Sequence, residues 1–298
     1  MKVGILTSGG DAPGMNAFIS KFTTLATAAG FEVIAFKFGY QGLIDNSTKP
    51  LTREDVSNIA HLGGSNIKST RSSEFLTKQG FKRAIQNIKL NEIDCLVILG
   101  GDGTLRGAKE LSVAGIKVIY IPATIDNDLS YTDQTLGFDS AVNAAVDAID
   151  KIKQTMLSLN RIFICEVMGR HCPDIAISSA IATDATILIT EAKNFSFKET
   201  ISKIKEAIES GEEAPSIVIR ENILDVFELA KKIQNELDIE TRACRIGYVQ
   251  RGTSPSVMDR ILARKFAQAV LDLISSKKFN RAVGQVKNKI ITKNLTEI

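Results

Sequence analysis

The chain has 298 residues, of which 44% are hydrophobic and 24% are charged, a composition typical of a soluble globular protein that is long enough for two lobes. Because 37 Lys and Arg residues nearly balance 34 Asp and Glu residues, and the late basic segment at 277–293 is interrupted by apolar residues, we expect no nucleic-acid partner. No apolar run approaches the roughly 18 residues that cross a membrane, and no signal peptide precedes the first strand, so we expect a cytoplasmic protein without a membrane partner.

Strand-like and helix-like segments alternate along the first half of the chain. Short apolar runs predict buried strands, and apolar residues at three- and four-residue steps predict helices. The expected elements in chain order are strand 3–7, helix 14–29, strand 31–38, helix 78–88, strand 94–99, helix 104–114 and strand 117–121.

The same alternation continues through the second half, beginning with a long amphipathic helix at 140–155. The elements that follow are strand 161–167, helix 175–183, strand 186–190, helix 197–210, strand 216–220, helix 223–237, strand 244–249, helix 258–275 and a last strand near 281–290. Such alternation predicts an α/β fold with two Rossmann-like lobes, whose mostly parallel sheets are covered by helices. We expect a larger lobe at 1–138 plus 251–298 and a smaller lobe at 139–250.

Two glycine-rich loops follow predicted strands and open predicted helices. The first glycine loop is Ser8–Gly14, and the second is Gly100–Thr104. Glycines let a backbone approach a phosphate, and the amides at a helix N-terminus favour an anion. A plain strand-to-helix turn would also use glycine, but two such loops on successive strand ends favour phosphate binding. Neither loop matches G-x-x-x-x-G-K-[ST] or G-x-G-x-x-G.

Carboxylates accompany these loops. Asp102 lies among the phosphate-binding amides, where it would repel a phosphate unless a cation lay between them, so the sequence predicts Mg²⁺ there. A helix cap is the alternative role for Asp102. The acidic turn, Thr124–Asp128, follows the strand 117–121 and offers Asp126 as a general base, with Asp128 orienting it or helping to hold the metal. An Asx-turn network without chemistry is the alternative.

Four arginines stand at predicted strand boundaries. They are Arg161, Arg170, Arg242 and Arg251. Arginine forks match phosphate oxygens and stabilise the charge that develops during transfer. Four are too many for one transferred phosphoryl group, which favours an acceptor that already carries a phosphate, although surface salt bridges could account for any one of them.

Cysteine and histidine usage argues against a second kind of metal site. Cys95, Cys165, Cys172 and Cys244 show no C-x-x-C spacing, and three of them, Cys172 excepted, lie in apolar runs, which predicts buried thiols. Only two histidines are present, which excludes a histidine-rich cluster.

Together these motifs resemble those of the bacterial ATP-dependent 6-phosphofructokinases. The resemblance runs from Val3 to about Gln285. It is carried by residues 6–16, by the second glycine loop and the acidic turn, by the arginine turn Met168–Arg170 with Val167 before it, and by Gln250–Gly252. Membership of this family implies transfer of the γ-phosphoryl group of ATP to the 1-hydroxyl of fructose 6-phosphate, in a homotetramer with shared active sites.

The resemblance also implies a role for each matching residue. Asp126 would be the base, Thr124 would support the sugar site, and Arg170 would stabilise the transition state. The 6-phosphate would be bound by Arg251 and by Arg161 and Arg242 of a neighbouring subunit. Met168, Gly169 and Glu221 match sugar-binding positions. The ATP side would comprise Gly10, Tyr40, Arg71, Ser72, Gly101, Asp102, Gly103, Thr104, Arg106 and Gly107, with Asp102 as the Mg²⁺ ligand.

Four departures from the family pattern qualify these expectations. Gly103 and Ala123 stand where pyrophosphate-using relatives carry Asp and Lys, which favours ATP, and the departure is Ala123 itself, because the ATP-using enzymes usually have Gly at that position. Tyr248 replaces a histidine that contacts the sugar phosphate, which predicts weaker substrate binding because tyrosine carries no positive charge. The chain also stops short of the family's usual C-terminal helical segment, which puts subunit contacts and stability in question but not the chemistry.

The fourth departure is the family's effector site, which has lost most of its cations. Residues that differ from the family's there are Ser20, Thr24, Thr183, Asp184 and 210–213, whereas Arg53 and Lys153 are retained. We therefore expect little response to ADP or phosphoenolpyruvate.

Two alternative hypotheses for the function are a different kinase family and a regulatory subunit. NAD kinases and diacylglycerol kinases share the second glycine loop, but they lack the acidic turn and the arginine turn together. A catalytically weak regulatory subunit of a mixed oligomer would suit the depleted effector site and Tyr248. The intact Asp102, Asp126 and Arg170 argue against such a subunit.

Overall fold

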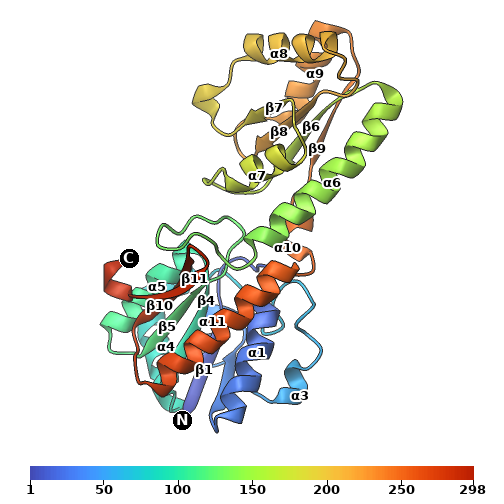
Figure 1. Cartoon of the computed structure of the whole chain (residues 1–298). Helices are drawn as coiled ribbons and strands as arrows, with labels where there is room; N and C mark the ends of the chain where they lie inside the picture. The colour runs from blue at the N-terminus through green and yellow to red at the C-terminus, as the bar shows by residue number, and fades with distance from the viewer. The chain divides into compact units, whose positions relative to one another are not determined.

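The computed structural model describes residues 1–298 as two compact α/β units (Figure 1). One unit comprises Met1–Ser140 and Arg251–Ile298, and the other comprises Ala141–Gln250. The chain passes from one unit to the other within the helices α6 (Phe138–Leu159) and α10 (Val249–Gly252). The expected α/β class with mostly parallel sheets is confirmed. No helix is long and apolar enough to cross a membrane.

The larger unit is built on a seven-stranded sheet with the order β11-β10-β5-β4-β1-β2-β3. Its strands are β1 (Lys2–Thr7), β2 (Glu32–Phe36), β3 (Thr48–Leu51), β4 (Cys95–Gly100), β5 (Val118–Pro122), β10 (Arg281–Val286) and β11 (Lys289–Asn294). All neighbours pair in parallel except the two edge strands, β3 and β11.

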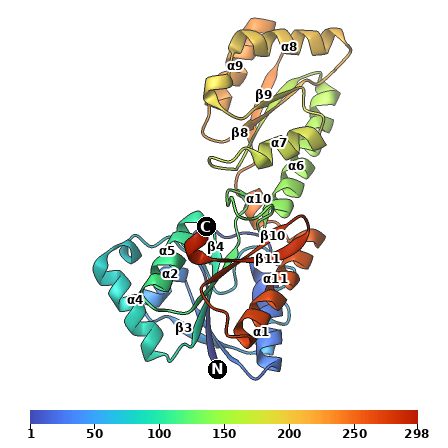
Figure 2. The same ribbon diagram turned by 60° about the vertical axis from the view of Figure 1, so that its left-hand side comes forward.

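Helices cover both faces of this sheet (Figure 2). They are α1 (Met15–Ala28), α2 (Gly39–Ile44), α3 (Arg53–Val56), α4 (Lys78–Leu90), α5 (Asp102–Val113) and α11 (Val257–Ser275), with 3₁₀ turns at η1 (Glu74–Leu76) and η3 (Leu295–Glu297). One hydrophobic cluster joins α4 and α5 to β4 and β5 through residues such as Ile88, Leu111 and Ile98. On the opposite face α1 packs against α11, and Phe18, Phe22 and Phe266 are fully buried.

The smaller unit contains a four-stranded parallel sheet with the order β7-β8-β6-β9. Its strands are β6 (Ile162–Val167), β7 (Ile187–Ile189), β8 (Ser216–Arg220) and β9 (Thr241–Arg245), and its other elements are α7 (Asp174–Ala182), η2 (Ala192–Asn194), α8 (Phe197–Glu209) and α9 (Val226–Leu237). A second cluster of mostly isoleucine and leucine side chains lies between this sheet and the helices α8 and α9.

Four features of the structure differ from the sequence-based expectation. The strand expected at 244–249 ends instead at Arg245, because a turn and the short helix α10 follow it. The single strand expected near 281–290 is an antiparallel hairpin of β10 and β11, which turns at Lys287 and Asn288, both in the left-handed region. Residues 39–56, for which no element was expected, form α2, β3 and α3. Cys244, expected to be buried, is only partly buried.

Candidate active site

The two glycine loops and the acidic turn lie side by side in the larger unit. They follow β1, β4 and β5, which are adjacent and parallel, so their C-terminal ends share one edge of the sheet. The amide of Ser8 donates to the carbonyl of Leu99 over 3.0 Å. A Cβ atom added at Gly101 would lie only 3.3 Å from Cβ of Thr124. This edge contains the point where the strand order reverses, which is where ligands bind in open α/β sheets.

The first glycine loop needs glycine at defined positions. Gly9 and Gly14 have φ values of 85° and 93°, in the left-handed region that other residues rarely adopt. Gly14 precedes α1, and no side chain caps the first turn of that helix. Arg251 forms an ion pair with Asp11 and lies 2.9 Å from the Cβ position of Gly10. The loop therefore combines amides at a helix N-terminus with a docked guanidinium.

The second glycine loop begins α5 at Asp102. Gly101 is the N-cap and supplies no side-chain hydrogen bond, which leaves the first amides of α5 without a side-chain cap. The hydroxyl of Thr104 donates to the carbonyl of Ser8 over 3.0 Å and joins this loop to the first one. A Cβ atom at Gly103 would meet nothing within 4 Å. The arrangement leaves open space beside Gly103 at a helix N-terminus, where an anion is favoured.

Tyr120 binds the backbone of the second glycine loop through its hydroxyl group. Its hydroxyl donates to the carbonyl of Gly100 over 2.5 Å and to that of Gly101 over 3.1 Å. Burial raises the pKa of Tyr120 well above its ordinary value, and the charges of Asp128 and Asp102 add to that shift. Both carboxylates therefore lie close enough to act on the same buried hydroxyl, which places the acidic turn and Asp102 in one electrostatic neighbourhood.

The remaining residues expected on the nucleotide side take two different positions. Arg71 and Arg106 are exposed, and Arg106 forms an ion pair with Asp102 one helical turn away. Ser72 donates its hydroxyl to Gln41 over 2.7 Å. Tyr40 is only 5% exposed, and its hydroxyl donates to the carbonyl of Thr104 over 2.7 Å. The side chain of Tyr40 thus lies beneath α5, where it supports the helix.

Gly107 explains why Tyr40 can lie so close to the helix. A Cβ atom at this position would lie 2.7 Å from the Tyr40 ring, well below a normal contact distance. The ring of Tyr40 also stacks on Phe75, with centroids 4.0 Å apart. Gly107 therefore matches a packing requirement of α5.

The acidic turn is held in place by its own backbone and by the segment that follows it. Asp126 is 7% exposed, and its amide donates to the hydroxyl of Thr124 over 3.2 Å. Asn127 has a φ of 54° and accepts the amide of Thr135 over 3.0 Å. The hydroxyl of Thr135 donates to the carbonyl of Thr124 over 2.6 Å. Asp128 is exposed. The turn therefore presents one buried and one exposed carboxylate.

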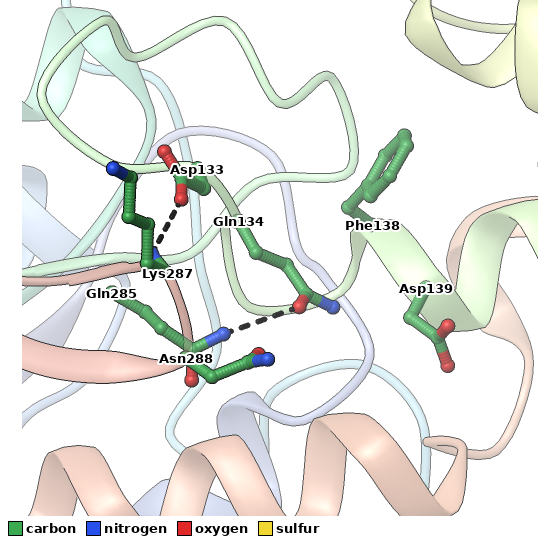
Figure 3. Close-up of a pocket in the computed structure, with 7 residues that line it drawn as sticks. All are labelled: Asp133, Gln134, Phe138, Asp139, Gln285, Lys287 and Asn288. Atoms are coloured by element: carbon green, nitrogen blue, oxygen red, sulfur yellow. Dashed lines mark hydrogen bonds between the residues drawn. The ribbon is translucent and has the colours of Figure 1, made fainter.

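A pocket of about 400 Å³ lies behind the acidic turn, between the segment 133–139 and the β10–β11 hairpin (Figure 3). Its lining is mostly polar and contains none of the predicted site residues. Asp133 joins the two sides: its carboxylate accepts the amide of Lys287 over 2.7 Å, and its carbonyl accepts the side-chain amide of Asn127 over 3.3 Å. The hairpin therefore supports the acidic turn through Asp133.

The smaller unit carries the arginine turn at the end of β6. Gly169 has a φ of 143° and Arg170 a φ of 49°, so both residues depart from ordinary backbone conformations. The carboxylate of Glu221 accepts the amides of Gly169 and Arg170 over 3.1 and 2.8 Å. Gln250 is fully buried and accepts the amide of Met168 over 2.9 Å. The structure thus brings together all three residues of the turn with Glu221.

Two further arginines of the smaller unit share one carboxylate. Arg161 and Arg242 each form an ion pair with Glu240, Arg161 over 2.5 Å. Nε of Arg161 is buried and has no hydrogen-bond partner. Tyr248 is 78% exposed. Arg161 and Arg242 therefore have adjacent guanidinium groups, both of which contact Glu240.

Polar residues at the expected effector positions are bonded to the chain itself. The hydroxyl of Ser20 donates to the carbonyl of Val56 over 2.7 Å, and that of Thr24 donates to Ser20 over 2.8 Å. The retained Lys153 donates to the carbonyl of Thr183 over 3.2 Å. Each of these three side chains thus donates to a backbone carbonyl of the chain itself.

The donor set fits Mg²⁺ only when the cation is bound together with phosphates. No group of three or more His, Cys, Asp or Glu side chains could hold a metal by itself. Mg²⁺ is usually bound by one or two carboxylates together with substrate phosphates and water. Asp102, 39% exposed in its side chain at the start of α5, is one such carboxylate. The residues present therefore fit a Mg²⁺–phosphate complex.

Sequence reasoning missed several supporting residues. Tyr120, Thr135 and Arg220 bind backbone groups of the three predicted turns. Tyr120 lies in an apolar strand and is indistinguishable from a core residue in sequence. Arg220 ends a strand, which was the one available signal, because the four arginines predicted for the site lie at strand boundaries too.

The fold and the paired loops define a class: an α/β protein of two units with two glycine loops and a carboxylate turn at one edge of the larger sheet. Comparison with known proteins is more specific, because residues 2–274 match the sequence profile of the phosphofructokinase family. The chain belongs to the phosphofructokinase family.

Individual relatives cover nearly the whole chain. An ATP-dependent 6-phosphofructokinase of Photobacterium profundum is 42% identical over 290 residues, which is 97% of this chain and 91% of the relative. One from Mesomycoplasma hyopneumoniae is 42% identical over 298 residues, covering 100% of this chain and 92% of the relative. The crystal structure of Pichia pastoris phosphofructokinase in the T-state superposes with a TM-score of 0.92 at 31% identity, and the match covers 99% of this chain and 35% of that one.

Proposed function

We propose that this chain transfers the γ-phosphoryl group of ATP to the 1-hydroxyl of fructose 6-phosphate, giving fructose 1,6-bisphosphate and ADP in glycolysis. The observation that carries the proposal is the close approach of the second glycine loop to the acidic turn, where a Cβ atom added at Gly101 would lie 3.3 Å from Cβ of Thr124, in a chain of this family. That close approach would bring a phosphate bound at a helix N-terminus next to a buried carboxylate, as phosphoryl transfer requires.

The larger unit would bind the nucleotide and supply the base. Backbone amides of both glycine loops would bind phosphate oxygens, with Arg71, Ser72 and Arg106 beside them. Asp102 would hold Mg²⁺, which neutralises phosphate charge when it is bound. As the bond between the sugar O1 and Pγ forms and the bond from Pγ to the β-phosphate oxygen breaks, the carboxylate of Asp126 would accept the hydroxyl proton. Thr124 and Asp128 would orient the acceptor and the base.

The smaller unit would bind the sugar phosphate. Met168, Gly169 and Glu221 would contact the sugar, and Arg170 would stabilise the charge on the transferring group. The 6-phosphate would be bound by Arg161, Arg242, Tyr248 and Arg251. We place the reaction in the cytoplasm and propose a homotetramer in which Arg161 and Arg242 serve a neighbouring subunit's site.

A coupled assay of the purified chain with ATP, Mg²⁺ and fructose 6-phosphate tests the proposal. Asp126→Ser should lower kcat by about 10²–10⁴-fold, the usual contribution of a positioned general base. Asp272→Asn removes an exposed carboxylate from α11 and is the matched control. Parallel assays with pyrophosphate and with tagatose 6-phosphate define the donor and the acceptor. Wild-type kcat in Asp126→Ser would contradict the assignment of the base.

Shared active sites can be tested by mixing inactive variants. Asp126→Ser removes the proposed base, and a chain with both Arg161→Ser and Arg242→Ser lacks the two arginines proposed to bind the 6-phosphate. If Arg161 and Arg242 of one subunit complete the active site of its neighbour, some sites in a hybrid oligomer contain both an intact base and intact arginines. Activity should therefore return when the two variants are mixed. Absence of recovery, after light scattering has shown that hybrids form, would contradict the shared site.

A further inference from the structure

Arg220 is the last residue of β8, and its side chain reaches two neighbouring strand ends. Its Nε donates to the carbonyl of Thr190, just beyond β7, over 2.9 Å. Its Nη1 donates to the carbonyl of Arg170, in the turn after β6. The guanidinium therefore joins the C-terminal ends of three adjacent strands, with the arginine turn as one of its two acceptors.

The neighbouring residue, Glu221, binds the backbone amides of the same turn. Its carboxylate accepts the amides of Gly169 and Arg170. Arg170 is thus held at its amide by a carboxylate and at its carbonyl by a guanidinium. Hydrogen bonds to charged groups are about twice as strong as neutral ones, so this pair of contacts is well suited to fixing one peptide geometry.

Such fixing is needed because Arg170 has an unfavourable backbone. A left-handed conformation is unfavourable for a non-glycine residue, and the φ of Arg170 is 49°. Arg170 is also exposed, so its own side chain is not packed into a core that would hold this conformation. The hydrogen bonds from Arg220 and Glu221 offset that cost, and they set the direction in which the Arg170 side chain leaves the backbone.

We propose that Arg220 is a positioning residue for phosphoryl transfer, which acts by holding the carbonyl of Arg170 and thereby aiming the Arg170 guanidinium. It does so without touching substrate or the reacting atoms. The proposal rests on the proposed function, in which Arg170 stabilises the transferring phosphoryl group.

Arg220→Met removes both donors and keeps the length of the apolar stem, whereas Arg220→Lys keeps the charge and one donor group. We expect kcat to fall about 10- to 100-fold in Arg220→Met, as for other small misplacements of a catalytic group, with KM for ATP unchanged and partial recovery in Arg220→Lys. Lys231→Met, which removes an exposed cation paired with Glu228 on α9, should behave as wild type. Wild-type kcat in Arg220→Met would overturn the proposal.

A double-mutant cycle separates positioning from a general structural role. If Arg220 acts only through Arg170, the chain with both Arg170→Ala and Arg220→Met should have the kcat of Arg170→Ala alone. A further tenfold loss in the double variant would overturn the proposal. Wild-type kcat in Arg170→Ala would instead refute the catalytic role of Arg170 in the proposed function.

Hydrogen exchange gives a readout that does not depend on activity or on the proposed function. The amides of Gly169 and Arg170 donate to the carboxylate of Glu221, and the amide of Cys172 donates to the carbonyl of Gly169 over 2.8 Å. In Arg220→Met these amides should exchange at least tenfold faster, while the strand amides of β6 stay as protected as in wild type. Unchanged exchange in the turn would show that Arg220 does not hold it.

Discussion

Asp259 should make the stability of the larger unit depend on pH in the direction opposite to most carboxylates. This carboxylate is fully buried at the start of α11 and accepts the amides of Gly137 and Ser140, each over 2.9 Å, and the hydroxyl of Ser140. Burial raises its pKa to about 6, and the neighbouring charge of Asp139 adds to the effect, although the hydrogen bonds oppose it.

The sign follows from comparing the two states. The unfolded chain releases the Asp259 proton near pH 3.8, whereas the folded chain keeps it until about pH 6. Folding therefore takes up a proton in this window, and the contribution of Asp259 to stability is largest below pH 3.8 and is lost as the pH rises through 6. A shift of about two pKa units corresponds to roughly 3 kcal/mol.

Asp259→Asn removes this titration, and Asp272→Asn on the same helix is the control. Urea unfolding followed by circular dichroism at several pH values from 4 to 7 gives the free energy of unfolding for each variant. Taking the difference between wild type and Asp259→Asn cancels the pH dependence of all other groups. That difference should increase in favour of wild type by about 2.4 kcal/mol between pH 7 and pH 4, because the rest of the roughly 3 kcal/mol is gained only at lower pH. A flat difference, or one that slopes the other way, would refute the reasoning.

Four other outcomes follow from the site. Tyr120→Phe removes the hydroxyl donor from the carbonyls of Gly100 and Gly101, which keep their backbone amide donors, and should cost about 0.5–1.5 kcal/mol in urea unfolding; no measurable loss would show that this hydroxyl does not stabilise the fold. Gly103→Asp meets no steric obstacle, so the protein should fold normally but lose kcat/KM with ATP, a loss that an unchanged value would disprove. Tyr248→His should lower KM for fructose 6-phosphate below pH 7, where imidazole gains charge, and an unchanged KM would count against it. Phosphoenolpyruvate should leave KM for fructose 6-phosphate unchanged, and a severalfold rise at micromolar concentration would contradict this.

The alternation of elements could be predicted because central strands are buried on both faces and read as continuous apolar runs, as in β4 and β5. The errors occur at edge strands. In β9 only Thr241 is buried, whereas the more apolar segment after it is a turn and helix in which Val249 is 63% exposed. The hairpin was missed for a related reason: its turn at Lys287 and Asn288 contains no glycine, so the usual Asn-Gly signal is absent.

The site could be predicted as far as its chemistry follows from residue type. Carboxylates, glycines and arginines at strand ends were visible in sequence, and the structure brings the two glycine loops and the acidic turn together. Their supports were not visible, because each joins residues far apart in the chain. Gln250 lies 82 residues from the amide that it accepts, and Arg220 lies 50 residues from Arg170. Only the folded topology makes such pairs neighbours.

The acidic turn and the arginine turn are built in the same way. Each contains a non-glycine residue in the left-handed region, Asn127 in one and Arg170 in the other. Each is held by hydrogen bonds to its backbone, from Thr135 in the first turn and from Arg220 in the second. Support through the backbone leaves the reactive side chains to be oriented toward ligands. Substitution of a supporting residue should therefore change the orientation of the proposed reactive group but not its chemical identity. For this reason we expect such substitutions to lower kcat.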